Sequence, residues 1–299
     1  MKGVAIITRT KNRPIMLRRA MTSIGEQTLS DFDWIVVNDG GDPGPVEDII
    51  KSAKGIGISA IVKHNASSVG MEAAANIGLR SSNSKYVVIH DDDDTWERDF
   101  LLKTVGFLEE CQHDSAIRGV VSRSMKVEEV IENDRIVIKE SRAYNPHLVA
   151  ISLIEMANLQ NVPPPISFLY EREVLDIIGY YREDLPVLGD WEFNLRFLRR
   201  YEIGIIPDYL ANYHWRVNLK GGNYSNTVVS EIDKHMTYGA RLRNELLRKD
   251  MDDNVIGIGF LVNIVAELQR YFNSFMAIEL VLRKLSNNRI ARYIYRILT

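Results

Sequence analysis

The chain has 299 residues, of which 45% are hydrophobic and 26% charged, and its formal net charge at pH 7 is -3. This composition is typical of a globular protein and excludes the disordered, collagen-like and coiled-coil classes. A slightly acidic chain with no basic, aromatic-lined segment in its α/β part also argues against nucleic-acid binding.

One cysteine and two apolar segments bear on the cellular compartment. The single cysteine, Cys111, excludes an internal disulfide framework and a zinc site made of several thiolates, and it is consistent with a reducing environment. The apolar run within residues 1–8 is too short for a signal peptide, and residues 255–266 fall short of the ~20 residues that a membrane span needs. We therefore expect a cytoplasmic protein.

The first third of the chain alternates between apolar runs and amphipathic segments. Strands are predicted at 3–8, 34–37, 58–62 and 86–89, and helices at 14–26, 46–54 and 71–79. This alternation implies parallel pairing, right-handed crossovers and a doubly wound sheet. Ligands of such sheets bind at the carboxyl ends of the strands. The polar residues at those ends are Thr8, Thr10, Asp39, His64, Asn65 and the run Asp91 to Asp94.

The rest of the chain is predicted to be mixed α and β. A hairpin is expected at 125–140, a strand at 166–170 after the rigid Pro163-Pro164-Pro165 turn, and a helix at 191–198. After about residue 229 the pattern is helical to the end. The fold class is therefore α/β with a mixed sheet and a C-terminal helical extension.

Four consecutive aspartates follow the predicted strand at 86–89, in the sequence HDDDDTW. Their mutual repulsion at the end of a buried strand is costly unless a cation compensates it. A hard divalent ion, held by one or two carboxylates together with phosphate oxygens and water, is how proteins usually bind diphosphate substrates. The alternative is a solvated acidic turn that caps a helix near Trp96, but a cap needs one carboxylate.

Four motifs occur in the order found in family 2 glycosyltransferases: TKNRP at 10–14, VVNDGG at 36–41, GMEAAANIG at 70–78 and HDDDDTW at 90–96. Over roughly residues 4–215 the chain resembles an inverting GT-A fold enzyme with an Asp-x-Asp element. The resemblance implies a glycosyltransferase domain at 1–228 and a C-terminal helical segment at 229–299. Within that domain, 1–96 is the Rossmann-like nucleotide-binding half and 97–228 the acceptor-side half.

The resemblance also implies roles for residues at the strand ends. Asp39 would accept a hydrogen bond from the N–H group of a uracil or similar base, although an aspartate before two glycines is also a common turn residue. Asp93 and Asp91 would bind Mn²⁺ or Mg²⁺. His214 is either a further ligand, which would favour manganese, or a structural histidine. The implied nucleotide-binding residues are Thr8, Thr10, Arg13, Asp39, Gly70, Asp91 and Asp92.

Two positions depart from the family pattern and leave the donor open. Lys11 stands where many relatives have a tyrosine that stacks on the base, and Ala75 replaces the arginine of the common Ala-Arg-Asn sequence. These departures also suggest a second interpretation, a glycosyltransferase-like fold kept as an inactive scaffold subunit. A third is a haloacid-dehalogenase-like phosphatase, because Asp91-x-Asp93-x-Thr95 follows a strand, although three predicted strands precede it.

The segment VLGDWEFNLR at 187–196 resembles the acceptor side of the family. There Asp190 would be the general base, which takes a proton from an acceptor hydroxyl as its oxygen attacks the anomeric carbon and inverts it. Asp190 could instead cap a helix, and Glu192 is a second candidate base. The glycine-rich stretch after Arg216 is either an ordinary turn or a loop that brings Arg216 and Lys220 over the diphosphate.

The C-terminal segment has two parts. Apolar residues recur at helical spacing after residue 256, which favours a core-packing helix. Residues 283–298 are basic and amphipathic, which is typical of peripheral contact with an anionic membrane or a partner chain. The function expected is transfer of a sugar from a nucleotide-diphosphate donor, UDP-linked, to a hydroxyl of a cell-surface glycan or lipid-linked saccharide at the inner face of the cell membrane.

Overall fold

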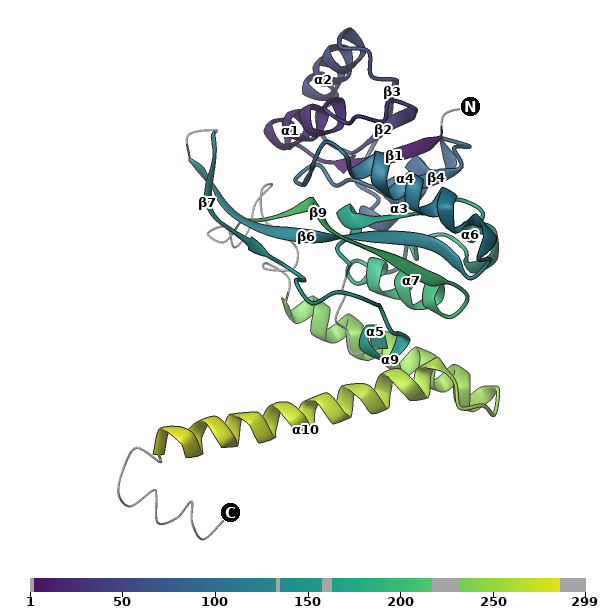
Figure 1. Cartoon of the computed structure of the whole chain (residues 1–299), viewed down its shortest axis with the longest axis vertical. Helices are drawn as coiled ribbons and strands as arrows, with labels where there is room; N and C mark the ends of the chain where they lie inside the picture. Colours follow the sequence, from purple (N-terminus) through teal and green to yellow (C-terminus); the bar gives the residue numbers. More distant parts are fainter. Residues whose placement is uncertain (1–2, 133–134, 158–162, 217–231, 286–299) are drawn as a thin grey trace. The chain divides into compact units, whose positions relative to one another are not determined.

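The computed structural model describes residues 3–132, 135–157, 163–216 and 232–285. The chain divides into two compact units, one made of residues 1–156 and 161–239 and the other of residues 157–160 and 240–299. Figure 1 shows the elements of both units. The boundary expected between 228 and 229 lies outside the described residues.

The first unit begins with four parallel strands joined by helices. The strands are β1 (Val4–Thr10), β2 (Phe32–Asp39), β3 (Ala60–Asn65) and β4 (Tyr86–Ile89), and the helices are α1 (Pro14–Gly25), α2 (Pro43–Gly55) and α3 (Met71–Arg80). The alternating β/α order is confirmed. Because the strands are parallel, Thr10, Asp39 and the run after Ile89 lie at the same edge of the sheet.

The sheet continues as a mixed sheet of nine strands among the described residues, in the order β3-β2-β1-β4-β8-β6-β9-β5, with β7 paired to β6. Its later strands are β5 (Thr95–Trp96), β6 (Ile117–Glu132), β7 (Arg135–Ala143), β8 (Phe168–Glu171) and β9 (Glu202–Arg216). Strand β8 runs antiparallel to β4 and β6, whereas β9 runs parallel to β6. The predicted mixed second half is therefore confirmed.

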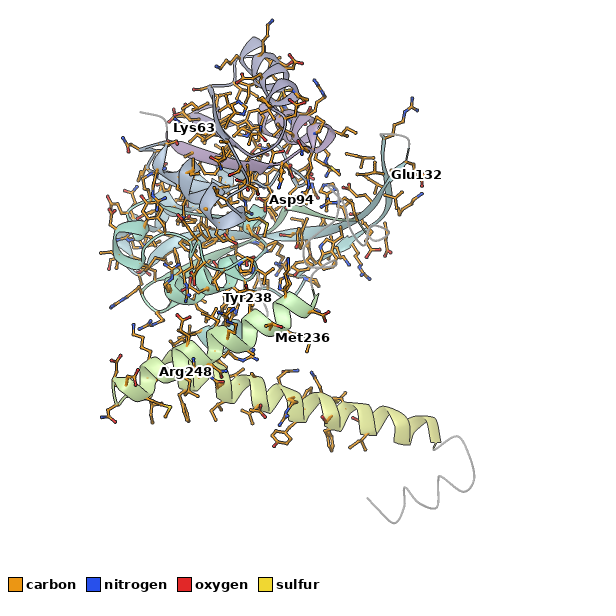
Figure 2. The ribbon with its side chains drawn as sticks, turned by 180° about the vertical axis from the view of Figure 1, so that it is seen from behind. Lys63, Asp94, Glu132, Met236, Tyr238 and Arg248 are labelled. Carbon is orange, nitrogen blue, oxygen red and sulfur yellow. The ribbon has the colours of Figure 1, made fainter. Side chains whose placement is uncertain are left out.

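The two long strands β6 and β9 bring residues from later in the sequence to the carboxyl edge of β4. Strand β9 ends at Arg216, beside Glu129 of β6, and it pairs antiparallel with β5 directly after the acidic run. Beyond this point β6 continues with β7 as a hairpin arm that ends near Glu132 (Figures 1 and 2). Asp94, by contrast, lies inside the unit, among side chains of the sheet (Figure 2).

Shorter helices complete the first unit. They are α4 (Phe100–Glu110), the 3-10 turn η1 (Cys111–His113), α5 (Leu153–Ala157), the 3-10 turn η2 (Pro165–Ser167), α6 (Val174–Ile178) and α7 (Gly189–Leu198). Helix α7 begins two residues before the helix predicted at 191–198.

The second unit is helical. Helix α9 (Ile232–Asp252) enters it at residue 240, and α10 (Ile258–Leu285) follows after a turn in which Asp250 accepts hydrogen bonds from the backbone N–H groups of Gly257 and Phe260, at 3.0 and 2.7 Å. Val262 is fully buried, whereas Leu268, Tyr271 and Phe272 are exposed, so the core-packing interpretation is wrong for the middle of α10. No helix in the described part of the chain combines the length and apolarity that crossing a membrane requires.

Two tryptophans show how the core supports the carboxyl edge of the sheet. Trp34 of β2 is fully buried, and its indole N–H donates to Thr8 Oγ1 at 2.8 Å. Trp96 stacks on Phe100 with ring centroids 4.4 Å apart, and its indole donates to the carbonyl of Ile166 at 2.7 Å. Buried indoles need such acceptors, because an unpaired N–H group loses its hydration without compensation.

Replacement of Thr8 by valine is expected to lower the free energy of unfolding by about 1–3 kcal/mol, because the buried Trp34 N–H loses its acceptor at nearly constant side-chain volume. Urea unfolding followed by tryptophan fluorescence measures the change. Thr104→Val is the matched control, since the equally buried Thr104 hydroxyl bonds only carbonyls of its own helix. Equal effects of the two substitutions would contradict the assignment.

Candidate active site

A pocket lies at the carboxyl ends of β1, β2 and β4, between the first turns of α3 and α7. Several residues expected in a site line it together: Thr10, Arg13, Asp39, Gly70, Asp91, Asp92, Asp93 and Asp190. Among the described residues that line it, seven are Asp or Glu and three are Lys or Arg. The pocket is therefore strongly acidic, although it has three cationic side chains in Arg9, Lys11 and Arg13.

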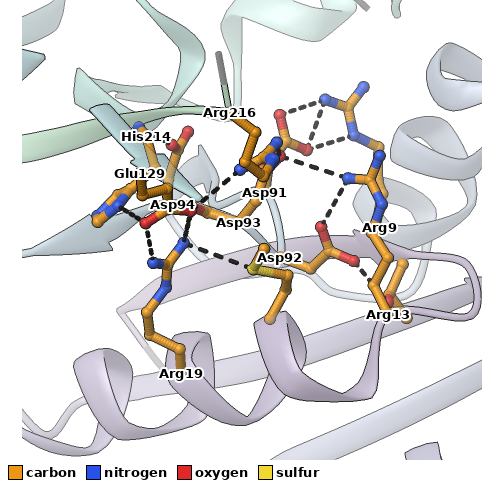
Figure 3. A network of polar contacts seen from close by, with 12 residues as sticks. Arg9, Arg13, Arg19, Asp91, Asp92, Asp93, Asp94, Glu129, His214 and Arg216 are labelled. Atoms are coloured by element: carbon orange, nitrogen blue, oxygen red, sulfur yellow. Dashed lines mark hydrogen bonds and ion pairs between the residues drawn. The ribbon is translucent and has the colours of Figure 1, made fainter. Parts of the chain in front are cut away.

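The aspartate run is compensated mainly by arginines (Figure 3). Arg9 of β1 makes a two-pronged contact with Asp91, with Nε–Oδ1 and Nη2–Oδ2 distances of 2.8 and 2.7 Å. Asp93 pairs with Arg216 of β9 and, at 3.3 Å, with Arg13. Charge-assisted bonds of this kind are strong where the local dielectric constant is low.

The other two aspartates of the run take polar partners. Asp92 accepts from the Thr10 hydroxyl at 2.7 Å and from Arg13 at 3.3 Å. Asp94 accepts from the backbone N–H of His214 at 2.8 Å. Asp91 and Asp92 are thus bonded to β1, and Asp93 and Asp94 to β9, which fixes the directions of the four side chains.

Burial and these partners pull the pKa values of the run apart. Burial raises the pKa of Asp92 to about 6, against the opposing effect of Arg13. Burial acts in the same sense on Asp93, but Arg216, Arg13 and Arg19 outweigh it and lower its pKa to about 2. Burial and the neighbouring Asp93 raise the pKa of Asp94 well above its ordinary value. Asp93, which lies beside three arginines, is therefore fully ionised at neutral pH.

A second group of charges lies behind the run, centred on the fully buried Glu129 of β6. Glu129 accepts from Arg19 of α1 at 2.5 Å, is 2.7 Å from Nδ1 of His214 and 3.4 Å from Nη1 of Arg216. The other ring nitrogen of His214 is 2.9 Å from the Thr95 hydroxyl. Arg19 also donates to the carbonyl of Asp93, so Glu129 and its partners hold the backbone of the run.

Asp39, at the end of β2, organises the loop before α3. Its two carboxylate oxygens accept four hydrogen bonds: from Asn65, the Ser68 hydroxyl and the backbone N–H groups of Val69 and Gly70, at 2.9, 2.7, 2.8 and 3.1 Å. Burial acts to raise its pKa, but these bonds outweigh it and lower the pKa. Gly40 is required beside it, because its φ is +72° and a Cβ would lie 2.4 Å from the backbone N of Ser68.

Asp190 lies in the first turn of α7 and faces the pocket. Its Oδ1 accepts from the N–H of Trp191 at 2.8 Å, and burial raises its pKa. Leu188, just before the helix, has the left-handed φ of +67° that side chains rarely adopt, so strain is stored beside Asp190. Glu192 lies two residues after Asp190, does not line the pocket and is paired with Arg196 through two bonds of 2.7 Å. The geometry therefore favours Asp190 over Glu192 as the group that meets a substrate.

Other predicted residues lie outside the pocket lining. Thr8 is buried beneath it with Trp34, and its role toward a nucleotide stays a prediction. His214 and Arg216 lie behind Asp93 and Asp94, and Lys220 lies outside the described residues. Arg9, Glu72, Arg19 and Glu129 were not expected. Of these four, only Arg9 and Glu72 had a recognisable feature in the sequence. Arg9 lies at the end of a predicted strand, and Glu72 lies in the first turn of a predicted helix that follows a glycine.

The site supplies some, but not all, of the ligand atoms that a divalent cation needs. Asp93 and Asp91 line a pocket with excess negative charge, so an anionic diphosphate needs added positive charge to enter. His214 is less suited as a ligand, because both of its ring nitrogens are already hydrogen-bonded. In the part of the chain that the structure describes, no three His, Cys, Asp or Glu side chains are grouped to hold a metal ion on their own. The donor set that fits is one or two carboxylates completed by substrate oxygens.

An α/β domain with a mixed sheet and an acidic site at the end of β4 is the architecture of GT-A transferases, and comparisons with known proteins agree. The sequence profile of glycosyl transferase family 2 matches residues 5–175. The chain belongs to this family, which leaves the phosphatase interpretation without support.

Curated relatives carry glycosyltransferase names. The chain is 24% identical over 204 residues to the uncharacterized glycosyltransferase YwdF of Bacillus subtilis, covering 68% of this chain and 71% of that protein. It is 24% identical over 267 residues to the poly(ribitol-phosphate) beta-N-acetylglucosaminyltransferase TarP of Staphylococcus aureus, covering 84% and 77%. It is 26% identical over 250 residues to a PGL/p-HBAD biosynthesis glycosyltransferase of Mycobacterium bovis, covering 80% and 85%.

Solved structures confirm the GT-A fold. The S. aureus TarS fragment 1–349 in complex with UDP-GlcNAc has a TM-score of 0.55 at 18% identity, over 75% of this chain and 60% of TarS 1–349. The mannosyltransferase PcManGT of Pyrobaculum calidifontis, in complex with GDP-Man and Mn²⁺, has a TM-score of 0.58 at 16% identity, over 98% and 82% of the two chains. The chain thus spans less than two thirds of the TarS fragment.

Glu129→Gln is expected to lower the free energy of unfolding at pH 7 by about 3–5 kcal/mol, since Arg19 and Arg216 lose their counter-charge and the bond to His214 is weakened. Burial opposes ionisation of Glu129, but His214 and Arg19 outweigh it and lower its pKa to about 2. Its contribution is therefore full above the ordinary value near 4.5 and is lost as the pH falls toward 2. Urea unfolding from pH 3 to pH 7 should show a smaller pH dependence in the variant.

The neighbouring Glu128→Gln is the control for Glu129→Gln, because Glu128 is only partly buried and pairs with Lys126. Its unfolding curve should stay near that of the native chain. Equal losses in the two variants would contradict the central position of Glu129.

Proposed function

We propose that the protein is an inverting, metal-dependent glycosyltransferase that moves a sugar from a UDP-linked donor to a hydroxyl of a cell-surface glycan or lipid-linked saccharide. The observation that carries this proposal is that Asp93, at the end of β4, and Asp190, at the start of α7, line one pocket. A group that can bind the leaving diphosphate and a group that can take a proton thus face the same space.

Donor binding is assigned to the β1, β2 and α3 side of the pocket. Thr10, Arg13 and the loop held by Asp39 line it there, with Asp91 and Asp92 below. A nucleoside would contact this loop, and the diphosphate would extend toward Asp93 and Arg13. A uracil base is supported by the TarS structures in complex with UDP and UDP-GlcNAc, whereas the PcManGT complex with GDP-Man keeps a guanine donor open to test.

Mn²⁺ or Mg²⁺ would be held by Asp93, with Asp91 nearby. When bound, such an ion neutralises charge on the departing diphosphate. The chain's own cations assist this role, because Arg13 and Arg216 already lie against Asp93. His214 would become a ligand only by giving up its bond to Glu129 or Thr95.

Asp190 is assigned as the general base. Burial raises its pKa, and this increases its affinity for the proton of an acceptor hydroxyl. Its Oδ1 is bonded to the Trp191 N–H group, and the pocket-lining carboxylate would take the proton as the acceptor oxygen attacks the anomeric carbon. A single displacement of this kind inverts the configuration. Tyr181 and Tyr213 also line the pocket and offer aromatic surface to a sugar ring.

The acceptor and the location are inferred from the relatives and the sequence. TarP, with its poly(ribitol-phosphate) acceptor, supports a cell-surface glycan. We place the enzyme in the cytoplasm, peripheral to the inner face of the membrane through the basic segment 283–298, most of which lies outside the described residues. The domain division proposed is 1–228 for transfer, with 1–96 binding nucleotide and 97–228 the acceptor, and 229–299 as the helical segment.

Asp190→Asn should abolish sugar transfer and leave donor affinity nearly unchanged, because the amide keeps the shape of the side chain but cannot take the proton. Release of UDP from UDP-GlcNAc, with water as acceptor, and calorimetric binding of UDP measure the two effects. Loss of UDP binding in this variant would remove Asp190 from the role of base.

Asp93→Ala should weaken nucleotide binding only where it depends on the metal. Titrations of UDP, GDP and dTDP, each with and without Mn²⁺, identify the base and the metal requirement together. Glu171→Ala is the control, since this buried carboxylate lies on β8 and does not line the pocket. Manganese-dependent binding that persists in Asp93→Ala would contradict the assignment, and no binding of any nucleotide by the native chain would favour the scaffold interpretation.

A further inference from the structure

Helix α10 of the second unit exposes large apolar side chains along one face. Leu268, Tyr271 and Phe275 are 63%, 66% and 65% exposed, and Ile264 and Ile278 are 44% and 59% exposed. Single apolar residues on a surface are common, but a continuous row of them is rare unless it contacts a partner. The exposed row therefore indicates an interaction surface.

The row follows a heptad repeat. Six apolar residues of α10 are separated alternately by three and four positions: Leu261, Ile264, Leu268, Tyr271, Phe275 and Ile278. These six residues form the seam of α10. In the sequence, leucines continue the same spacing at 282 and 285. An average spacing of 3.5 residues is typical of helices that wind around a partner helix, because each apolar side chain then inserts between side chains of that partner.

The seam lies on the side of α10 that is turned away from α9. On the α9 side, Asn263 donates to the carbonyl of Arg243 at 3.0 Å, and a Cβ on Gly259 would lie 2.1 Å from the carbonyl carbon of Leu246. With 3.6 residues per turn, the seam is centred on the opposite side of the helix from Gly259 and Asn263. A second helix can therefore lie along the seam without displacing α9.

The charges of α10 favour a protein partner over a membrane. Between residues 260 and 278 the only charged residues are Glu267 and Arg270, and they pair with each other at 2.7 Å. A helix that lies on an anionic membrane has an excess of Lys and Arg on its polar face. This part of α10 has no such excess, so an apolar and uncharged partner fits the seam better.

The exposed apolar surface is large enough for a stable dimer. Six side chains on or beside the seam are roughly half exposed or more: Ile264, Leu268, Tyr271, Phe272, Phe275 and Ile278. At roughly 100 Å² of accessible surface each, two copies that cover these side chains remove about 1,200 Å² from water. Specific, stable interfaces begin at about this area.

We propose that α10 is a dimerisation surface and that its partner is α10 of a second copy of this chain, with the two helices paired along their seams. The seam is uncharged, so no like charges meet when it pairs with itself, and a self-complementary surface is what twofold symmetry requires. This inference does not depend on the catalytic roles proposed above.

The test is sedimentation equilibrium of the full chain over a wide range of concentrations. The native chain should reach twice its monomer mass of 34.2 kDa. Leu268→Lys and Phe275→Lys should each raise the dissociation constant of the dimer by at least ~30-fold, the change that corresponds to a loss of about 2 kcal/mol at a central interface residue. Phe275→Leu, which keeps the seam apolar, should still form the dimer.

Met276→Lys is the matched control, because Met276 is an exposed apolar residue of the same helix that does not belong to the seam. It should dimerise as the native chain does. Folding of each variant is checked by urea unfolding followed by tryptophan fluorescence, since all four tryptophans lie in the first unit and report on it separately from α10.

Three results would overturn the proposal. One is a native chain that stays at its monomer mass at every concentration. Another is a dimer that persists in both Leu268→Lys and Phe275→Lys, or that Met276→Lys weakens equally. The third comes from flotation with vesicles of phosphatidylcholine and phosphatidylglycerol: a monomeric chain that floats with them, and no longer floats in Phe275→Lys, would assign the seam to a membrane surface.

Discussion

Four adjacent carboxylates at the buried end of one strand are the constraint on which the rest of this structure depends. Asp92 and Asp94 are nearly inaccessible to solvent, so water cannot screen the repulsion in the run. The compensation comes from guanidinium groups on separate segments: Arg9 on β1, Arg13 just before α1, Arg19 on α1, and Arg216 at the end of β9. The mixed sheet is what brings these segments together.

The long strand β9 is the clearest case of this dependence. It runs parallel to β6 and ends at Arg216, which lies 123 positions along the chain from Asp93 and is fully buried beside it. Glu129 of β6 pairs with Arg216, His214 and Arg19 together and so locks β6, β9 and α1 around the run. Removal of any of these groups leaves a buried charge without its partner, which is a costly change.

The same arrangement prepares the pocket for chemistry. The arginines compensate Asp91 and Asp93 closely, whereas burial raises the pKa values of Asp92, Glu72 and Asp190. Carboxylates with ordinary environments would not divide in this way. The pocket therefore combines Asp93, which the arginines keep ionised, with carboxyl groups that bind protons more readily.

Much of this could be predicted from the sequence, and the exceptions have physical reasons. The strand at Tyr86–Ile89 and the aspartates after it were predictable, because a fully buried strand is a continuous apolar run and the charges that follow it must lie at the sheet edge. Glu129 was not predictable. In the sequence VEEV it looks like a solvent-facing position, but β6 changes register between Glu128 and Glu129, and Glu129 becomes buried. Arg9 and Glu72 meet only through the fold.

The most direct test of the account is a crystal structure of the protein grown with UDP and Mn²⁺, with the metal located by its anomalous scattering. The account predicts manganese in contact with the Asp93 carboxylate and the UDP diphosphate beside it in the acidic pocket. UDP bound with no metal at Asp93, or bound outside this pocket, would contradict it.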